Sequence, residues 1–174
     1  MIVRNTMKKL ILAAAFMLAL SGCSVKTEGA VGETLKTMFF DITVNSAYKA
    51  DELNEMKPMD EGNNFAVVNV TVKNTTDEAI PMGGVDFVCR WGTGKEECDY
   101  PMSVYSHENL TGEDLSEEYT LQKGETVTGN LVYIVPESST SFQLQTKETY
   151  TESDEGEMKE GETFTIIFNA ENPK

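Results

Sequence analysis

The sequence has few basic residues and only one histidine. Lysine and arginine number 14 against 29 aspartates and glutamates, which gives a formal net charge of −15 at pH 7. A surface with this excess of carboxylates repels nucleic acid, so we expect no nucleic-acid partner. With one histidine and three cysteines, the ligand set of a structural zinc site is hard to build. We therefore predict no metal site and no cofactor.

The chain also lacks an apolar run long enough to cross a bilayer. The run at residues 10–20 has eleven residues, whereas a membrane-spanning helix needs about 20. It follows Lys8 and Lys9, and a basic start before a short apolar core is the arrangement of a secretory signal. We predict that residues 1–22 are a signal peptide.

Leu20-Ser21-Gly22-Cys23 follows that run directly and resembles the lipobox of bacterial lipoproteins. The resemblance implies that Cys23 carries acyl chains such as palmitate and becomes the mature N-terminus. Residues 23–32 would then be the lipidated cysteine and a short tether. We expect an exported protein anchored to the outer face of the cell membrane. The alternative is ordinary secretion with cleavage near Gly22.

The clearest strand signal lies at residues 64–74. Ala66, Val68, Val70 and Val72 lie on one side of this stretch, and Asn69, Thr71 and Lys73 lie on the other. Period-2 alternation rich in β-branched residues indicates a strand with one buried face. Phe65 and Val67 extend the apolar character to the second face. We predict that this stretch is the central strand of a β-sandwich.

Other stretches alternate in the same way and are separated by turn signals. They are residues 38–45, 85–91, 96–102, 119–121, 126–135, 142–144 and 164–168. About eight strands without a useful amphipathic helix predict an all-β sandwich over residues 33–170, with a polar tail at 171–174. We expect residues 50–63 to form a polar loop, with a helical turn near 51–56.

Three stretches together resemble one family. They are Phe65-Ala-Val-Val-Asn-Val-Thr-Val-Lys-Asn-Thr75, Leu121-Gln-Lys-Gly-Glu125 and Gly129-Asn-Leu-Val-Tyr-Ile-Val-Pro136. This pattern resembles the immunoglobulin-like domain of unknown function numbered four-three-five-two, found in lipoproteins of Gram-positive bacteria and related in fold to a secreted mycobacterial antigen. The resemblance implies an immunoglobulin-like β-sandwich over roughly residues 32–169 and implies no catalytic residue.

Cys89 and Cys98 remain as a pair in an exported domain. If residues 92–95 form a four-residue hairpin loop, Trp91 faces Glu96 and the two cysteines face each other. Opposed residues in neighbouring strands have Cβ atoms about 4.5–5.5 Å apart, which brings a bridge within reach. We predict a disulfide; free thiols are the alternative.

Four aromatic residues are candidates for contact with a partner: Trp91, Tyr100, Tyr105 and Tyr119. We expect them near one end of the sandwich, where exposed aromatic side chains can anchor an interface. The alternative is that Trp91 caps the core. The resulting hypothesis is a lipid-anchored, non-enzymatic binding or interaction module, with a protein or cell-envelope partner at the cell surface.

Two other functions stay open. Removal of residues 1–22 leaves 11 basic and 29 acidic residues, a net charge of −18, and a cation-responsive module could use the acidic loops around Asp60 and Glu113. A hydrolase is a third hypothesis. His107 lies in an acidic loop, and without a second histidine or a free cysteine a catalytic triad is hard to build.

Overall fold

The computed structural model describes residues 25–150, 157 and 159–171. The predicted signal peptide and Cys23 lie outside these residues. The elements in chain order are β1 (Glu28–Ala30), β2 (Thr34–Lys36), β3 (Phe40–Ala50), β4 (Asn63–Asn74), β5 (Ile80–Gly83), the 3-10 turn η1 (Gly84–Asp86), β6 (Val88–Arg90), β7 (Cys98–Asp99), the 3-10 turn η2 (Met102–Val104), β8 (Glu118–Leu121), β9 (Thr126–Pro136), β10 (Ser141–Tyr150) and β11 (Lys159–Asn169). No helix in this part of the chain is long and apolar enough to cross a membrane.

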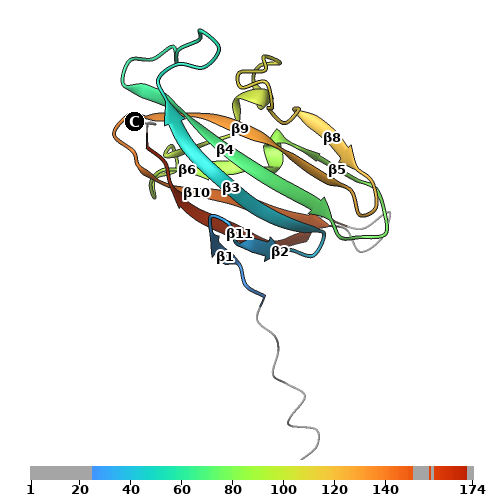
Figure 1. The fold of residues 1–174 in the computed structure, drawn as a ribbon. Helices are drawn as coiled ribbons and strands as arrows, with labels where there is room; N and C mark the ends of the chain where they lie inside the picture. Colours follow the sequence, from blue (N-terminus) through green and yellow to red (C-terminus); the bar gives the residue numbers. More distant parts are fainter. Residues whose placement is uncertain (1–24, 151–156, 158, 172–174) are drawn as a thin grey trace, which may run out of the picture.

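Two sheets pack face to face and confirm the predicted β-sandwich. One has the order β1-β11-β10-β6-β7 and the other β2-β3-β4-β9, with a separate β5-β8 pair. Figure 1 shows β3, β4 and β9 lying over β6 and β10. Apolar side chains from the two inner faces fill the space between the sheets, as the aligned packing of a sandwich requires.

The first strand corrects the predicted tether. β1 pairs in parallel with β11, with Gly29 opposite Ile166. The prediction of a tether through residue 32 is therefore wrong for residues 28–30. The polar composition of this segment suits an edge strand that buries little side-chain area, so composition alone could not distinguish the two. β2 and β5, both short, were also not predicted.

β4 confirms the prediction for the central strand. It lies between β3 and β9 in its sheet. Val68, Val70 and Val72 are fully buried in the main core. Phe65 and Val67 point to the other face, where they pack with Leu110 and Val132 in a second apolar cluster.

Residues 53–56 form a tight turn where the sequence predicted a helical turn near residues 51–56. Asn54 and Glu55 have φ angles of 46° and 64°, and two successive positive φ values are typical of a type I′ hairpin turn. Leu53 and Met56 exchange main-chain hydrogen bonds of 2.9 and 2.8 Å across it. Both side chains pack against the second apolar cluster, so tertiary packing decides the local conformation.

The hairpin formed by β6 and β7 is present, but its predicted register is wrong by one residue. Cys89 lies opposite Asp99, and Arg90 lies opposite Cys98. A shift of one residue places two side chains on opposite faces of a sheet. Both thiols are free: Cys89 is fully buried in the core, whereas Cys98 is partly exposed.

The loop of this hairpin explains the shift. The Trp91 main-chain amide donates to the Glu97 carbonyl at 3.0 Å, so residues 92–96 form a five-residue loop. The Glu97 carboxylate also accepts a hydrogen bond of 2.6 Å from the Gly94 amide. Glu96, which the sequence analysis placed in the second strand, therefore belongs to the loop.

Candidate binding site

The four aromatic residues predicted to contact a partner do not pack ring against ring in the described part of the chain. Among the described residues the aromatic ring pairs are Phe39 with Phe40 and Phe142 with Phe168. Trp91 and Tyr119 are partly buried against the main core.

Tyr100 and Tyr105 remain exposed and meet at Asp99. The Tyr105 hydroxyl donates to Asp99 Oδ1 at 2.7 Å, and the Tyr100 amide donates to the same oxygen at 2.8 Å. The hydrogen bond to Asp99 raises the pKa of Tyr105 to about 12. The structure thus brings together two of the four predicted residues, on a small exposed surface.

His107 borders a hollow of about 210 Å³ together with Ser103, Ser106 and Ser116. Its side chain is 92% exposed, and its Nδ1 lies 3.6 Å from Glu117 Oε2. In the part of the chain that the structure describes, no serine hydroxyl makes a hydrogen bond to His107. The contact between nucleophile and base that a serine hydrolase needs is therefore not formed.

In the acidic loop around Glu113, which was considered for cation binding, a carboxylate bonds to groups of the same loop. The Asp114 carboxylate accepts hydrogen bonds from the Leu110 amide at 2.6 Å and from the Thr111 hydroxyl. Within residues 25–150, 157 and 159–171, no three His, Cys, Asp or Glu side chains are placed to hold a metal ion.

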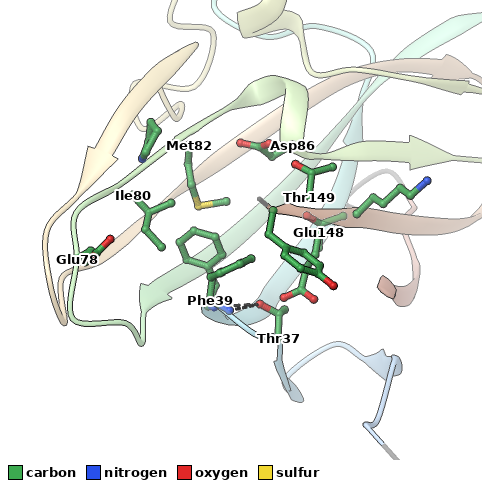
Figure 2. A pocket seen from close by; sticks show the side chains of 13 residues that line it. Thr37, Phe39, Glu78, Ile80, Met82, Asp86, Glu148 and Thr149 are labelled. Carbon is green, nitrogen blue, oxygen red and sulfur yellow. Dashed lines mark hydrogen bonds between the residues drawn. The ribbon is translucent and has the colours of Figure 1, made fainter. Parts of the chain in front are cut away.

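A cavity of about 340 Å³ opens at the end of the sandwich where β10 ends. Four segments line it: the loop between β2 and β3, residues 78–82 around β5, Asp86 in η1, and residues 146–150 of β10. Figure 2 shows Ile80, Met82 and Phe39 toward one side of this cavity and Glu148, Thr149 and Asp86 toward the other. The cavity has the size of a small-molecule or side-chain site.

The apolar side of the cavity is an extension of the main core. Phe40 and Met82 are buried, and Phe39 and Ile80 pack against them in part. The Phe39 and Phe40 rings meet edge to face, with centroids 6.3 Å apart and planes at 64°. This contact holds Phe39 in place at the cavity wall.

The polar side of the cavity carries two carboxylates, one buried and one half-buried. Glu148 is only 9% exposed, and its Oε1 accepts a hydrogen bond from the Met38 amide. Asp86 is half-buried, and its Oδ2 accepts a hydrogen bond of 2.8 Å from the Gly83 amide. Burial raises the pKa of Asp86, and the Gly83 hydrogen bond opposes this shift in part.

The charged side chains that line the cavity are mostly acidic. They are Glu78, Asp86 and Glu148, together with one lysine, Lys147. Lys147 pairs with Glu160, which lies outside the cavity, at 2.6 Å.

A second hollow lies beside this cavity and extends toward the N-terminus. It is lined by Val25, Lys36 and Met38, and it shares Glu148 and Tyr150 with the cavity. Val25 is two residues after the predicted lipidation site. The cavity thus lies at the part of the domain from which the N-terminal segment leaves.

No local sequence pattern predicts this cavity. Its lining residues come from segments as far apart as Thr37 and Tyr150. Glu148 and Asp86 stand among many surface carboxylates, so only their burial distinguishes them. Pro81 and Gly83 disfavour strands, yet residues 80–83 form a strand that pairs with β8.

Two structures of Bacillus subtilis proteins share the fold. ycdA, which is classed as a lipoprotein, has a TM-score of 0.56 and 18% identity over 78% of this chain. yjhA has a TM-score of 0.56 and 20% identity over 82% of this chain. The present chain spans 38% of ycdA and 99% of yjhA. No curated protein sequence matches the chain.

The family comparison extends the agreement to sequence. The model of the domain of unknown function DUF4352 matches residues 29–158. This match contains β4, β9 and every segment that lines the cavity. Because it covers most of the chain, the protein belongs to the DUF4352 family, as the resemblance in residues 65–75, 121–125 and 129–136 predicted.

Proposed function

We propose that this protein is an exported, lipid-anchored, non-enzymatic binding module that holds its ligand in the cavity between β5 and the end of β10. One observation carries the proposal: apolar side chains and the carboxylates of Glu148 and Asp86, one buried and one half-buried, line the same cavity. Removing carboxylates from water costs stability. A ligand that donates hydrogen bonds to them would offset part of this cost.

The anchor is proposed from the sequence. Cys23 follows a short apolar run and precedes β1 by five residues. Five extended residues span at most about 18 Å, so a lipid on Cys23 would hold the sandwich close to the bilayer. The assignment of ycdA, a structural relative, as a lipoprotein supports this localisation. The ligand would then be a protein or cell-envelope component at the membrane surface.

Cellular fractionation of the wild-type chain and a Cys23→Ser variant tests the anchor. We expect the wild-type protein in the membrane fraction, released only by detergent, and the variant in the soluble exported fraction. The mass of the N-terminal peptide should show acyl chains on Cys23. Equal fractionation of the two chains, with no acyl mass, would overturn the lipid anchor.

A variant that fills the cavity tests the binding site. Thr149 is an exposed residue of the cavity wall, so Thr149→Trp should occupy the space without disturbing the core. Binding of a set of amine, neutral and acidic fragments can be followed by amide chemical shifts. We expect shifts at Phe39 and Met82 in the wild-type protein and their loss in Thr149→Trp, with His107→Gln as the unchanged control. Fragments that shift only residues around His107 would overturn the assignment of the site.

The same fragments test the non-enzymatic part of the proposal. Ester, amide and glycoside fragments incubated with the protein should be recovered unchanged. Turnover that disappears in His107→Gln or Glu148→Gln would identify an enzyme.

A further inference from the structure

We infer that the outer face of the β2-β3-β4-β9 sheet carries a second binding site, which takes an uncharged oligosaccharide. The site is a hollow of about 510 Å³ where the side chains of Asn69 and Thr128 meet the loop at residues 113–116. No residue lines both this hollow and the cavity between β5 and the end of β10. The inference therefore goes beyond the proposed function and does not depend on it.

The floor of the hollow belongs to a continuous network of side-chain hydrogen bonds. Asn69 Nδ2 donates to Asn130 Oδ1 at 2.8 Å. In the next row of the sheet, the hydroxyls of Thr71 and Thr128 lie 2.8 Å apart. Asn45 Nδ2 connects the two rows, since it donates to Asn69 Oδ1 at 2.8 Å and to Thr71 Oγ1 at 2.9 Å. These bonds bring five uncharged polar side chains together across β3, β4 and β9.

A β-bulge gives Asn45 its place in this network. The pairing of β3 with β4 changes register between Val44 and Ser46, so Asn45 has no partner opposite it. Bulges turn side chains in new directions and are common beside functional sites. Asn45 is exposed, and its Oδ1 accepts no hydrogen bond from a described residue. The network thus holds an acceptor in a fixed position, and a fixed group loses less freedom when a ligand binds.

Thr128 adds main-chain groups to the same site. The Asn130 amide and carbonyl both bond away from β4, to Glu113 and Leu115. Main-chain groups alternate in direction along an antiparallel strand, so those of Thr128 also point away from β4. No other described residue bonds to them. The hollow therefore offers a main-chain donor and acceptor beside the neutral side chains.

The charges around the hollow exclude two classes of ligand. Glu113 and Asp114 line it, and they would repel an anion. The Asp114 carboxylate already accepts hydrogen bonds from the Leu110 amide and the Thr111 hydroxyl, and the described residues hold no group of three metal-binding side chains. A metal ion is therefore not favoured. A neutral ligand with many hydrogen-bonding groups fits best.

The pattern of free groups favours a sugar over a peptide strand. An added strand needs a row of free main-chain groups along the sheet edge, but those of Asn130 are already bonded to Glu113 and Leu115. A sugar hydroxyl both donates and accepts hydrogen bonds. It can therefore pair with an amide oxygen such as that of Asn45 or with the hydroxyl of Thr128.

Tyr48 supplies an aromatic ring beside the network. It lies opposite Val67 on the outer face of the sheet and is 37% exposed. Burial raises the pKa of Tyr48, and the nearby charges of Asp114 and Glu113 raise it further, so the residue lies near the loop that borders the hollow. A sugar ring has CH groups on its faces and hydroxyls at its edge. The CH groups can pack on an aromatic ring while the hydroxyls bond to the amides.

Titration of the full chain with trisaccharides tests the inference. The neutral probes are cellotriose, maltotriose and tri-N-acetylchitotriose, and trigalacturonic acid is the anionic counterpart. We expect a neutral probe to bind and to shift the main-chain amide signals of Asn69 and Thr128 and the side-chain amide signals of Asn45. The anionic probe should bind at least about tenfold more weakly.

Two variants locate the contact. Thr128→Val removes a hydroxyl and keeps the shape and the β-branched character of the residue, and Asn45→Ala removes the amide at the bulge. Each should weaken binding of the neutral probe by at least about fivefold. Thr126→Val is the matched control, because Thr126 is an exposed threonine of the same strand that does not line the hollow. Thermal unfolding of each variant verifies that the fold is retained.

Several results would overturn the inference. They are equal weakening in Thr128→Val and Thr126→Val, tighter binding of the anionic probe, and no binding of any neutral probe at tens of millimolar. Binding of an extended threonine-valine tetrapeptide at Thr128, with no response to the trisaccharides, would replace it by strand addition. None of these results bears on the proposed cavity, because the Thr149→Trp experiment follows Phe39 and Met82 instead.

Discussion

Glu148 accepts a hydrogen bond from the main-chain amide of Met38, which lies 110 residues earlier in the chain. Glu148 belongs to β10 in one sheet, and Met38 lies between β2 and β3 of the other. The bond therefore connects the two sheets at the rim of the cavity. It also holds the Glu148 carboxylate in place at the cavity wall.

Loss of this connection should destabilise the sandwich. Glu148→Ala removes the acceptor of the Met38 amide, and an unsatisfied buried group costs about 1–3 kcal/mol. We expect the free energy of unfolding to fall by about this amount in urea denaturation. Glu148→Gln should retain most of the stability because its amide oxygen can accept the same bond. Equal stability of Glu148→Ala and the wild-type protein would show that the bond contributes nothing to the fold.

Asp86 should make stability depend on pH in a defined direction. Burial raises the pKa of Asp86 above its ordinary 3.8, so the folded protein holds this proton more tightly than the unfolded chain. The stabilisation is complete below pH 3.8 and is lost as pH rises through the folded pKa. Asp86→Asn should therefore melt at a higher temperature than the wild-type protein at pH 7, and the difference should shrink toward pH 3.

Melting curves of both proteins between pH 3 and pH 7 measure this difference. A gap that stays constant over that range would exclude Asp86 as the titrating group.

The two thiols should differ in reactivity. Cys98 is partly exposed, with its Sγ donating to the Lys95 carbonyl at 3.3 Å. Cys89 is fully buried, and burial raises the pKa of its thiol, so the reactive thiolate is scarce. Peptide mapping after iodoacetamide treatment should show labelled Cys98 in the native protein and labelled Cys89 only after unfolding. If neither is labelled in denaturant without reductant, the two residues form the disulfide that the sequence suggested.

The Tyr133 hydroxyl is an unfavourable feature of the core. Tyr133 is fully buried, and among the described residues its hydroxyl has no hydrogen-bond partner. Such a group costs about 1–3 kcal/mol, and Tyr133→Phe removes it while keeping the ring. We expect unchanged or higher stability in urea denaturation, by up to about 2 kcal/mol after repacking. Tyr105→Phe is the comparison, since it loses a real hydrogen bond to Asp99 and should not gain stability. A clear loss in Tyr133→Phe would indicate a partner for the hydroxyl.

In the hairpin around residues 88–99, the strands could be predicted from the sequence but their pairing register could not. Alternating apolar residues correctly predicted two strands there, because side-chain direction alternates along any extended chain. The pairing register was wrong because it depends on the loop, where Glu97 bonds to the Gly94 amide. Side-chain to backbone bonds of this kind leave no periodic signal in the sequence.

The sequence by itself determined the class of the fold and its central strand. Ala66, Val68, Val70 and Val72 must share one face of an extended segment, and burying that face requires a second sheet. The cavity proposed as a binding site can be located only in the folded structure. The positions of Glu148 and Asp86 beside Phe39 depend on how the two sheets and the η1 turn pack. Burial is a property of that packing, since it arises from neighbours far away in the chain.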